Sequence, residues 1–296
     1  MSTTDIAVSA AQPVAKRKSV VRLSPVIVLC LAWLAIMVLV AIFADVIAPY
    51  GYADQSLLHR LKPPLFWGGT GDHLLGTDAL GRDIFSRLFF AIRTSVMIAL
   101  VGTLIGAVLG TFAGIVAAHF RGWVDDVVMV LVDFQASVPF LIVALAVLGF
   151  FGNNFVLFLF MVGLFGWETY ARLARGLVLA TNGQGYAFAI RTLGVHPARV
   201  YFKHVLPNIA SVLVVQLTLN FPDIILLETS LSFLGLGVQP PGTSLGLMLG
   251  EGRNYISTAW WIGIPAGFVI FLTTLSISLL GDWVRDHFDR TLATSE

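Results

Sequence analysis

Residues 186–207 read Tyr186-Ala-Phe-Ala-Ile-Arg-Thr-Leu-Gly-Val-His-Pro-Ala-Arg-Val-Tyr-Phe-Lys-His-Val-Leu-Pro207, a polar and basic stretch between long hydrophobic runs. Gly194 interrupts the stretch, and Pro197 is placed to open a second helix, because the first helical turn does not need the amide proton that proline lacks. The pattern predicts two short helices joined at Gly194. A folded connection of this length in a membrane chain needs a partner to dock against.

Apolar residues dominate the rest of the chain. Hydrophobic residues make up 57% of the sequence and charged residues 12%, whereas soluble domains are about 25% charged. Six runs are long enough to span a bilayer, since ~20 helical residues cover the ~30 Å hydrocarbon core. These runs are residues 26–48, 94–118, 125–151, 154–171, 209–233 and 257–280. We therefore expect an all-α membrane protein with six transmembrane helices.

Charge predicts how the spans are oriented. Four basic residues precede the first run: Lys16, Arg17, Lys18 and Arg22. Positive charge favours the cytoplasmic side, and six spans then place both termini in the cytoplasm. Residues 1–24 and 291–296 are expected to be tails around one transmembrane domain at 25–290. Within it, residues 49–92 should lie outside and residues 172–208 inside, although basic residues in the outer segment run against the rule.

Two features inside this domain have local interpretations. Residues 84–90 have an amphipathic pattern that favours a piece lying along the membrane interface before the second span. The second span carries glycines four residues apart, which places them on one helix face: Gly102, Gly106, Gly110 and Gly114. Such a stripe lets another helix approach closely. Packing within one bundle is the favoured interpretation, and a subunit contact or a moving helix face is the alternative.

The sequence contains no complete motif for catalysis or nucleotide binding. Residues 76–83 resemble the start of a phosphate-binding loop, but Arg82 and Asp83 stand where such a loop has Lys and Ser or Thr. Nucleophile-elbow, HExxH and metal-ligand spacings are absent, and a net charge of +1 does not suggest nucleic-acid binding. We expect no enzyme activity, metal or cofactor on this chain. If ATP is used, another subunit binds it.

Carboxylates within the spans are the other polar signal. Asp133, Glu168, Asp223 and Glu228 lie in or near apolar runs, where each costs roughly 2.5–3.5 kcal/mol to insert. Gln216, Asn220 and Asp223 fall at i, i+4 and i+7, which makes one polar stripe. Together with Glu228, these residues are candidates for the lining of a translocation path. Interhelical hydrogen bonding is the alternative, and structural roles are favoured for Glu228 and Asp133.

The residues of this hairpin resemble a known family. The 186–207 hairpin resembles the coupling loop of importer-type ABC permeases, with the pattern E-A-A, three residues, Gly, nine residues and I-x-L-P. Phe188, Ile190 and His204 depart from that pattern. The resemblance implies that the following residues contact an ATPase subunit: Ala189, Arg191, Gly194, His196, Arg199, Leu206 and Pro207.

Other segments narrow the resemblance to the C-type subunit of the dipeptide/oligopeptide/nickel permease family. They are residues 73–87, 231–241, 259–261 and 280–282. The resemblance implies a type I ABC importer permease fold in a bacterial inner membrane. It also implies four kinds of partner: a B-type permease, two cytoplasmic ATPases that carry ATP and Mg, an extracytoplasmic solute-binding protein and membrane lipid. Relatives often have arginine where this chain has Val130, which argues against an ion pair at Asp133.

The substrate is less well determined than the machinery. The resemblance implies transport of di- or oligopeptides, and nickel chelates, glutathione, opines or sugars are alternatives. A secondary transporter driven by an ion gradient is a remote alternative, supported only by the carboxylates within the spans.

Overall fold

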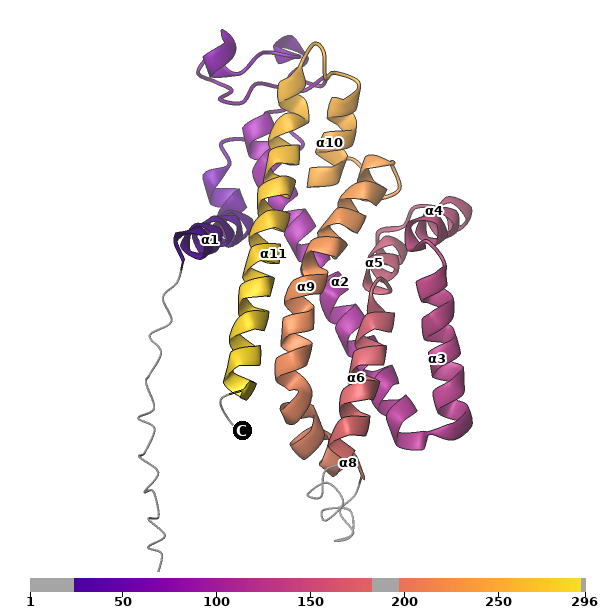
Figure 1. Cartoon of the computed structure of the whole chain (residues 1–296). Coiled ribbons are helices and arrows are strands. Elements are labelled where there is room, and N and C mark those ends of the chain that lie inside the picture. Colours follow the sequence, from indigo (N-terminus) through magenta and orange to yellow (C-terminus); the bar gives the residue numbers. More distant parts are fainter. Residues whose placement is uncertain (1–23, 183–196, 294–296) are drawn as a thin grey trace, which may run out of the picture.

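Helices form most of the structure, a computed structural model that describes residues 24–182 and 197–293 (Figure 1). The long helices are α1 (Pro25–Ile47), α2 (Ile84–Phe120), α3 (Gly122–Ser137), α4 (Phe140–Phe151), α5 (Phe155–Gly163), α6 (Trp167–Asn182), α9 (Leu206–Phe233), α10 (Leu245–Arg253) and α11 (Ile264–Ala293). Short turns of helix are η1 (Leu57–His59), η2 (Leu65–Trp67), α8 (Pro197–Val200), η3 (Tyr201–Val205) and η4 (Trp260–Ile262). The described residues therefore form the predicted all-α fold.

The predicted third span is not one straight helix. Within residues 24–182 and 197–293, five helical segments are long and apolar enough to cross a membrane, and a sixth results only if α3 and α4 are counted as one span bent by 90°. The bend falls at Val138 and Pro139. Proline lacks an amide proton and disfavours helical backbone at the residue before it, so the helix ends there. The predicted single span over 125–151 is wrong in this respect.

Two further boundaries differ from the prediction. Residues 84–90 are the first two turns of α2, capped by the Asp83 side chain, which accepts from the amide of Ser86. Ile84 and Arg87 are fully buried there, so this segment is continuous with the second span and packs against the rest of the protein. The fourth span continues past 171, because α6 resumes the helical path after a break at Gly166 (φ +80°) and ends at Asn182.

The glycine stripe of α2 packs inside the bundle, as the favoured interpretation predicted. An ideal Cβ at Gly106 would lie 3.1 Å from the carbonyl oxygens of Gly163 and Phe165, and one at Gly110 would overlap the Trp167 carbonyl oxygen at 2.1 Å. The absence of side chains on this face of α2 lets its backbone reach the backbone of α5 and α6. Close approach of these helices sets the spacing of the central bundle.

Residues 49–83 and α10 cover one end of the bundle, which we call the cap end (Figure 1). Asp78 accepts from Arg82 Nε at 2.6 Å and from Arg87 Nη1 at 2.5 Å. Glu251 of α10 accepts from both arginines, at 3.1 Å and 2.7 Å. The residues that resembled a phosphate-binding loop thus form a buried ion-pair network that ties α2 to α10.

Candidate functional site

The described arm of the hairpin lies at the opposite end of the bundle, which we call the hairpin end (Figure 1). Pro197 opens α8, as predicted, and the chain continues through η3 directly into α9. Pro207 stands in the first turn of α9, where its missing amide proton costs little. The second arm and α9 therefore form one nearly continuous helical rod.

A separate apolar cluster holds this arm against the bundle. Its buried members come from α2, α6, α8, η3 and α9: Ala118, Tyr170, Ala174, Val178, Val200, Tyr201, Val205, Ile209 and Leu213. A polar contact adds to it, since the Tyr201 hydroxyl lies 3.0 Å from His119 Nδ1 of α2. The arm is thus packed directly against α2, α6 and α9.

The predicted coupling residues divide into two groups. Arg199 and Pro207 are exposed, Leu206 is half-buried, and the nearby Lys203 is also exposed. The described arm therefore presents two cations to solvent at the hairpin end. Four of the predicted contacts lie outside the described residues: Ala189, Arg191, Gly194 and His196.

Two ion pairs join α3 to α6. Arg175 donates to both carboxylate oxygens of Asp125, at 2.5 Å and 2.6 Å. Arg172 Nη2 donates to Asp133 Oδ1 at 3.2 Å. The sequence-based doubt about an ion pair at Asp133 is therefore wrong. The arginine comes from the neighbouring helix α6 rather than from position 130 of the same helix.

Next to these pairs, Gln135 of α3 binds the break between α5 and α6. Its side-chain nitrogen donates to the Leu164 carbonyl at 2.7 Å and to Glu168 Oε2 at 3.1 Å, and its oxygen accepts from Trp167 Nε1 at 2.6 Å. Every hydrogen-bonding atom of this amide is used, so the contact fixes the position of α3 with little freedom. Sequence reasoning identified neither Gln135 nor Trp167.

The predicted stripe on α9 is only partly exposed. Gln216 is half-buried, Asn220 is buried, and Asp223 is exposed. Asn220 packs against Gly166, where an added Cβ would lie 2.7 Å from its amide nitrogen. The Tyr170 hydroxyl donates to the backbone carbonyl of Gln216 at 3.4 Å. The stripe thus begins at the α6 contact and ends at the exposed carboxylate of Asp223.

Glu228 is separated from these residues. It is fully buried, accepts from the Ser232 hydroxyl at 2.8 Å, and lies among the hydroxyls of Ser95 and Ser244. Its Oε2 makes no hydrogen bond with any residue that the structure describes. The surroundings come from α2, α9 and the start of α10, so Glu228 contacts three elements at the cap end rather than an open face.

The exposed charges on α3, α6 and α9 have a physical consequence. Asp133 and Arg172 are 73% and 54% exposed in their side chains, and both lie in segments of membrane-spanning composition. A charge cannot face hydrocarbon without a cost of several kcal/mol, of the order of 2.5–3.5 on insertion scales. This polar face must therefore adjoin water or another protein. Among the described residues no cluster suits a metal ion.

Comparisons with known proteins agree with this arrangement. Residues 106–294 match the family model of the binding-protein-dependent transport system inner membrane component, and residues 22–64 match the N-terminal TM domain of oligopeptide transport permease C.

Several curated relatives align over nearly the whole chain. The di/tripeptide transport system permease protein DppC of Pseudomonas aeruginosa is 36% identical, with 88% of this chain and 87% of the relative covered. The dipeptide transport system permease protein DppC of Escherichia coli K12 is 37% identical, with 88% of both covered. The glutathione transport system permease protein GsiD of Pectobacterium atrosepticum is 34% identical, with 87% and 84% covered.

A solved structure shares the fold. The inward-facing MetNI methionine ABC transporter matches with a TM-score of 0.57 at 18% identity, covering 69% of this chain and 97% of that chain. The type I ABC importer permease fold is thereby confirmed for the helical bundle.

Proposed function

The chain belongs to the binding-protein-dependent transport system inner membrane component family, and from this premise we propose that it is the C-type permease of an ATP-driven importer of di- and oligopeptides. The observation that carries the substrate class is the 36–37% identity to two permeases named for dipeptides or di/tripeptides, across 88% of the chain. The glutathione permease at 34% identity makes glutathione, itself a short peptide, the second candidate.

The proposed assembly has four further components. A B-type permease completes the channel, two ATPases bind ATP and Mg at the hairpin end, and a solute-binding protein delivers substrate at the cap end. The hairpin end is then cytoplasmic. Support comes from the exposed cations Arg199 and Lys203 on an arm that is continuous with α9. Basic groups there complement an acidic rim on an ATPase.

We assign the translocation path to the polar face of α3, α6 and α9. Its exposed members are Asp133, Arg172 and Asp223, with Glu168 and Gln216 half-buried beside them. Opposite charges on one wall can interact with both termini of a zwitterionic peptide. ATPase closure acts on the hairpin arm, which shares an apolar cluster with α6 and α9. This movement changes which end of the translocation path is open.

Reconstitution tests the substrate. The chain, its B-type permease, both ATPases and the binding protein are incorporated into liposomes, and uptake of a labelled dipeptide is followed with ATP, without ATP and with unlabelled competitors. ATP-dependent uptake that dipeptides suppress, and that nickel chelates, opines and sugars do not, is expected. Uptake by this chain alone on an ion gradient, or competition by a non-peptide only, contradicts the proposal.

Charge reversal tests coupling. Arg191→Glu and the double change Arg199→Glu with Lys203→Glu should weaken ATPase association and uptake, whereas a bulky residue at Gly194 should leave association and lose uptake. Arg285→Glu is the matched control, because Arg285 is an exposed cation near the end of α11 and outside the hairpin. Normal association and uptake in all hairpin variants would show that the loop does not couple the two subunits.

A further inference from the structure

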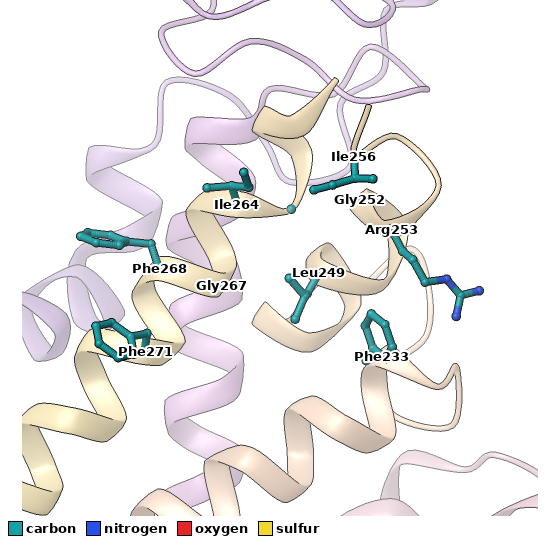
Figure 2. A pocket seen from close by; sticks show the side chains of 10 residues that line it. Phe233, Leu249, Gly252, Arg253, Ile256, Ile264, Gly267, Phe268 and Phe271 are labelled. Atoms are coloured by element: carbon teal, nitrogen blue, oxygen red, sulfur yellow. The ribbon is translucent and has the colours of Figure 1, made fainter. Parts of the chain in front are cut away.

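An apolar groove lies at the cap end, between the end of α9, α10 and the start of α11 (Figure 2). Its volume is about 560 Å³, within the ~300–1,000 Å³ range of ligand pockets. Apolar side chains line it, namely those of Phe233, Leu249, Ile264, Phe268 and Phe271. The exception is Arg253, which lies at the Phe233 end.

Glycines make the floor of the groove. Gly252 of α10 and Gly263 lie in backbone contact, since an ideal Cβ at Gly252 would be 2.6 Å from Gly263 Cα. An ideal Cβ at Gly267 would meet only Leu249 Cδ1, at 3.5 Å. The missing side chain at Gly267 leaves open space between α10 and α11. Phe268 and Phe271, 58% and 59% exposed, extend its wall along α11.

The groove runs beside a segment of membrane-spanning composition. It lies along α11, within the apolar segment Trp260–Asp286 that is long enough to span. Exposed phenylalanines in a membrane-spanning segment contact apolar groups, either from lipid or from a neighbouring helix. The apolar lining alone does not distinguish the two.

Arg253 does distinguish them. Its guanidinium stands 5.5 Å from the centroid of the Phe233 ring, at one end of the groove (Figure 2). Arg253 forms no ion pair within the described residues, and the neighbouring acid Glu251 is already bound by Arg82 and Arg87. The result is an exposed cation with an available charge at one end of an apolar groove. Burial beneath a partner's apolar helix would desolvate this cation without compensation.

We propose that this groove binds one anionic phospholipid, with an acyl chain over Gly267 and the headgroup phosphate on Arg253. A lipid satisfies both observations at once, because its tail matches the apolar floor and its phosphate pairs with the arginine. Phe233 holds the guanidinium in place through the cation–π contact. The site is independent of the peptide path, which lies on α3, α6 and α9.

The test is photolabelling of the full-length protein in phosphatidylcholine liposomes that contain a phosphatidylglycerol with a diazirine in its acyl chain. Labelled peptides are mapped after illumination. Label is expected on residues 249–271 in excess over α1, whose exposed residues Leu29 and Val46 report unspecific lipid contact. Unlabelled phosphatidylglycerol should compete, and phosphatidylcholine should not.

Variants of Arg253 and Gly267 test which parts of the groove hold the lipid. Arg253→Ala should lower the groove label about fivefold, the size of effect that one basic residue has at an anionic membrane surface, while Arg253→Lys retains it. Gly267→Leu should also lower the label by filling the floor. Arg253 is exposed, so its substitution leaves the fold intact even if Gly267→Leu does not.

Three outcomes overturn the proposal. They are equal labelling of the groove and α1, labelling that does not respond to headgroup charge, and labelling that is unchanged in Arg253→Ala. A fourth comes from the assembled transporter: if a cysteine at Phe268 crosslinks to the partner permease, a helix and not a lipid occupies the groove.

Discussion

Arg87 Nη1 of α2 lies 2.7 Å from Glu251 Oε2 of α10, although 164 residues separate them in the sequence. Arg87 is fully buried, and the same nitrogen also donates to Asp78. Its other two side-chain nitrogens, Nε and Nη2, have no partner among the described residues. The stability of the cap end therefore depends on keeping both carboxylates in place.

Loss of Glu251 should destabilise the protein strongly. In Glu251→Ala, Arg82 and Arg87 share only Asp78, and an under-compensated buried charge costs about 3–5 kcal/mol. The melting temperature of the purified protein in detergent measures the effect. Asp45→Ala is the control, since Asp45 is 69% exposed in its pair with Arg93 and such pairs contribute about 0–1 kcal/mol. Equal melting temperatures for the two variants would contradict this assignment.

Alanine substitutions at two glycines in and next to α6 should change the stability of the protein in opposite directions. Gly166 has φ +80° and a Cβ there would meet the Asn220 side chain at 2.7 Å, whereas nothing lies within 4 Å of a Cβ on Gly176 in α6. Gly166→Ala should cost at least about 1–2 kcal/mol from backbone strain alone. Gly176→Ala should stabilise by about 0.4–1 kcal/mol. Thermal unfolding of both variants measures the difference. If both substitutions changed the stability in the same direction, the α5–α6 break would not be constrained as described.

Charge exchange tests the pair between Asp133 and Arg172. Asp133→Arg or Arg172→Asp alone places like charges about where the 3.2 Å ion pair now lies. Each should reduce peptide uptake several-fold, since a coupling of ~1 kcal/mol corresponds to about a factor of five. The double exchange should restore most of the uptake. If the double variant is no better than the singles, these side chains act separately and the ion pair is incidental.

Removal of one hydroxyl tests transmission from the hairpin arm. Tyr201→Phe keeps the ring in its apolar cluster and removes the contact with His119. The loss in stability should be modest, about 0.5–1.5 kcal/mol. The number of peptides taken up per ATP hydrolysed should fall, because the arm is held less firmly against α2. Tyr255→Phe, at the cap end, is the control. An unchanged ratio in Tyr201→Phe would exclude His119 from coupling.

Breaks in the helices and short helices were not predicted from the sequence. Hydrophobic runs predicted α1 and α9 closely, because twenty apolar residues have only one stable arrangement in a bilayer. Pro139 was a visible signal for the bend between α3 and α4, and a continuous span was nevertheless expected across it. α10 was missed altogether. It has only nine residues, too few to appear as a hydrophobic run that could span a bilayer.

Polar side chains were harder to assign than helices. Asp133, Glu168, Asp223 and Glu228 look alike in the sequence, each a carboxylate near an apolar run. The structure places Glu228 in a closed cluster of hydroxyls, pairs Asp133 with Arg172, and leaves Asp223 exposed. Arg172 carried a signal that was overlooked, because it was assigned to a loop after 171 and not to the helix that continues there.

The sequence by itself determined the membrane class, most of the spans and, through segments such as the one around Gly194 and Pro207, the family. These properties depend on composition and on distances along the chain. Only the tertiary structure decided that Arg87 and Glu251 close the cap end, that Arg172 neutralises Asp133, and that Arg253 stands beside an apolar groove. Each of these pairings joins residues from different helices, and the environment of a charge is set by its neighbours in space.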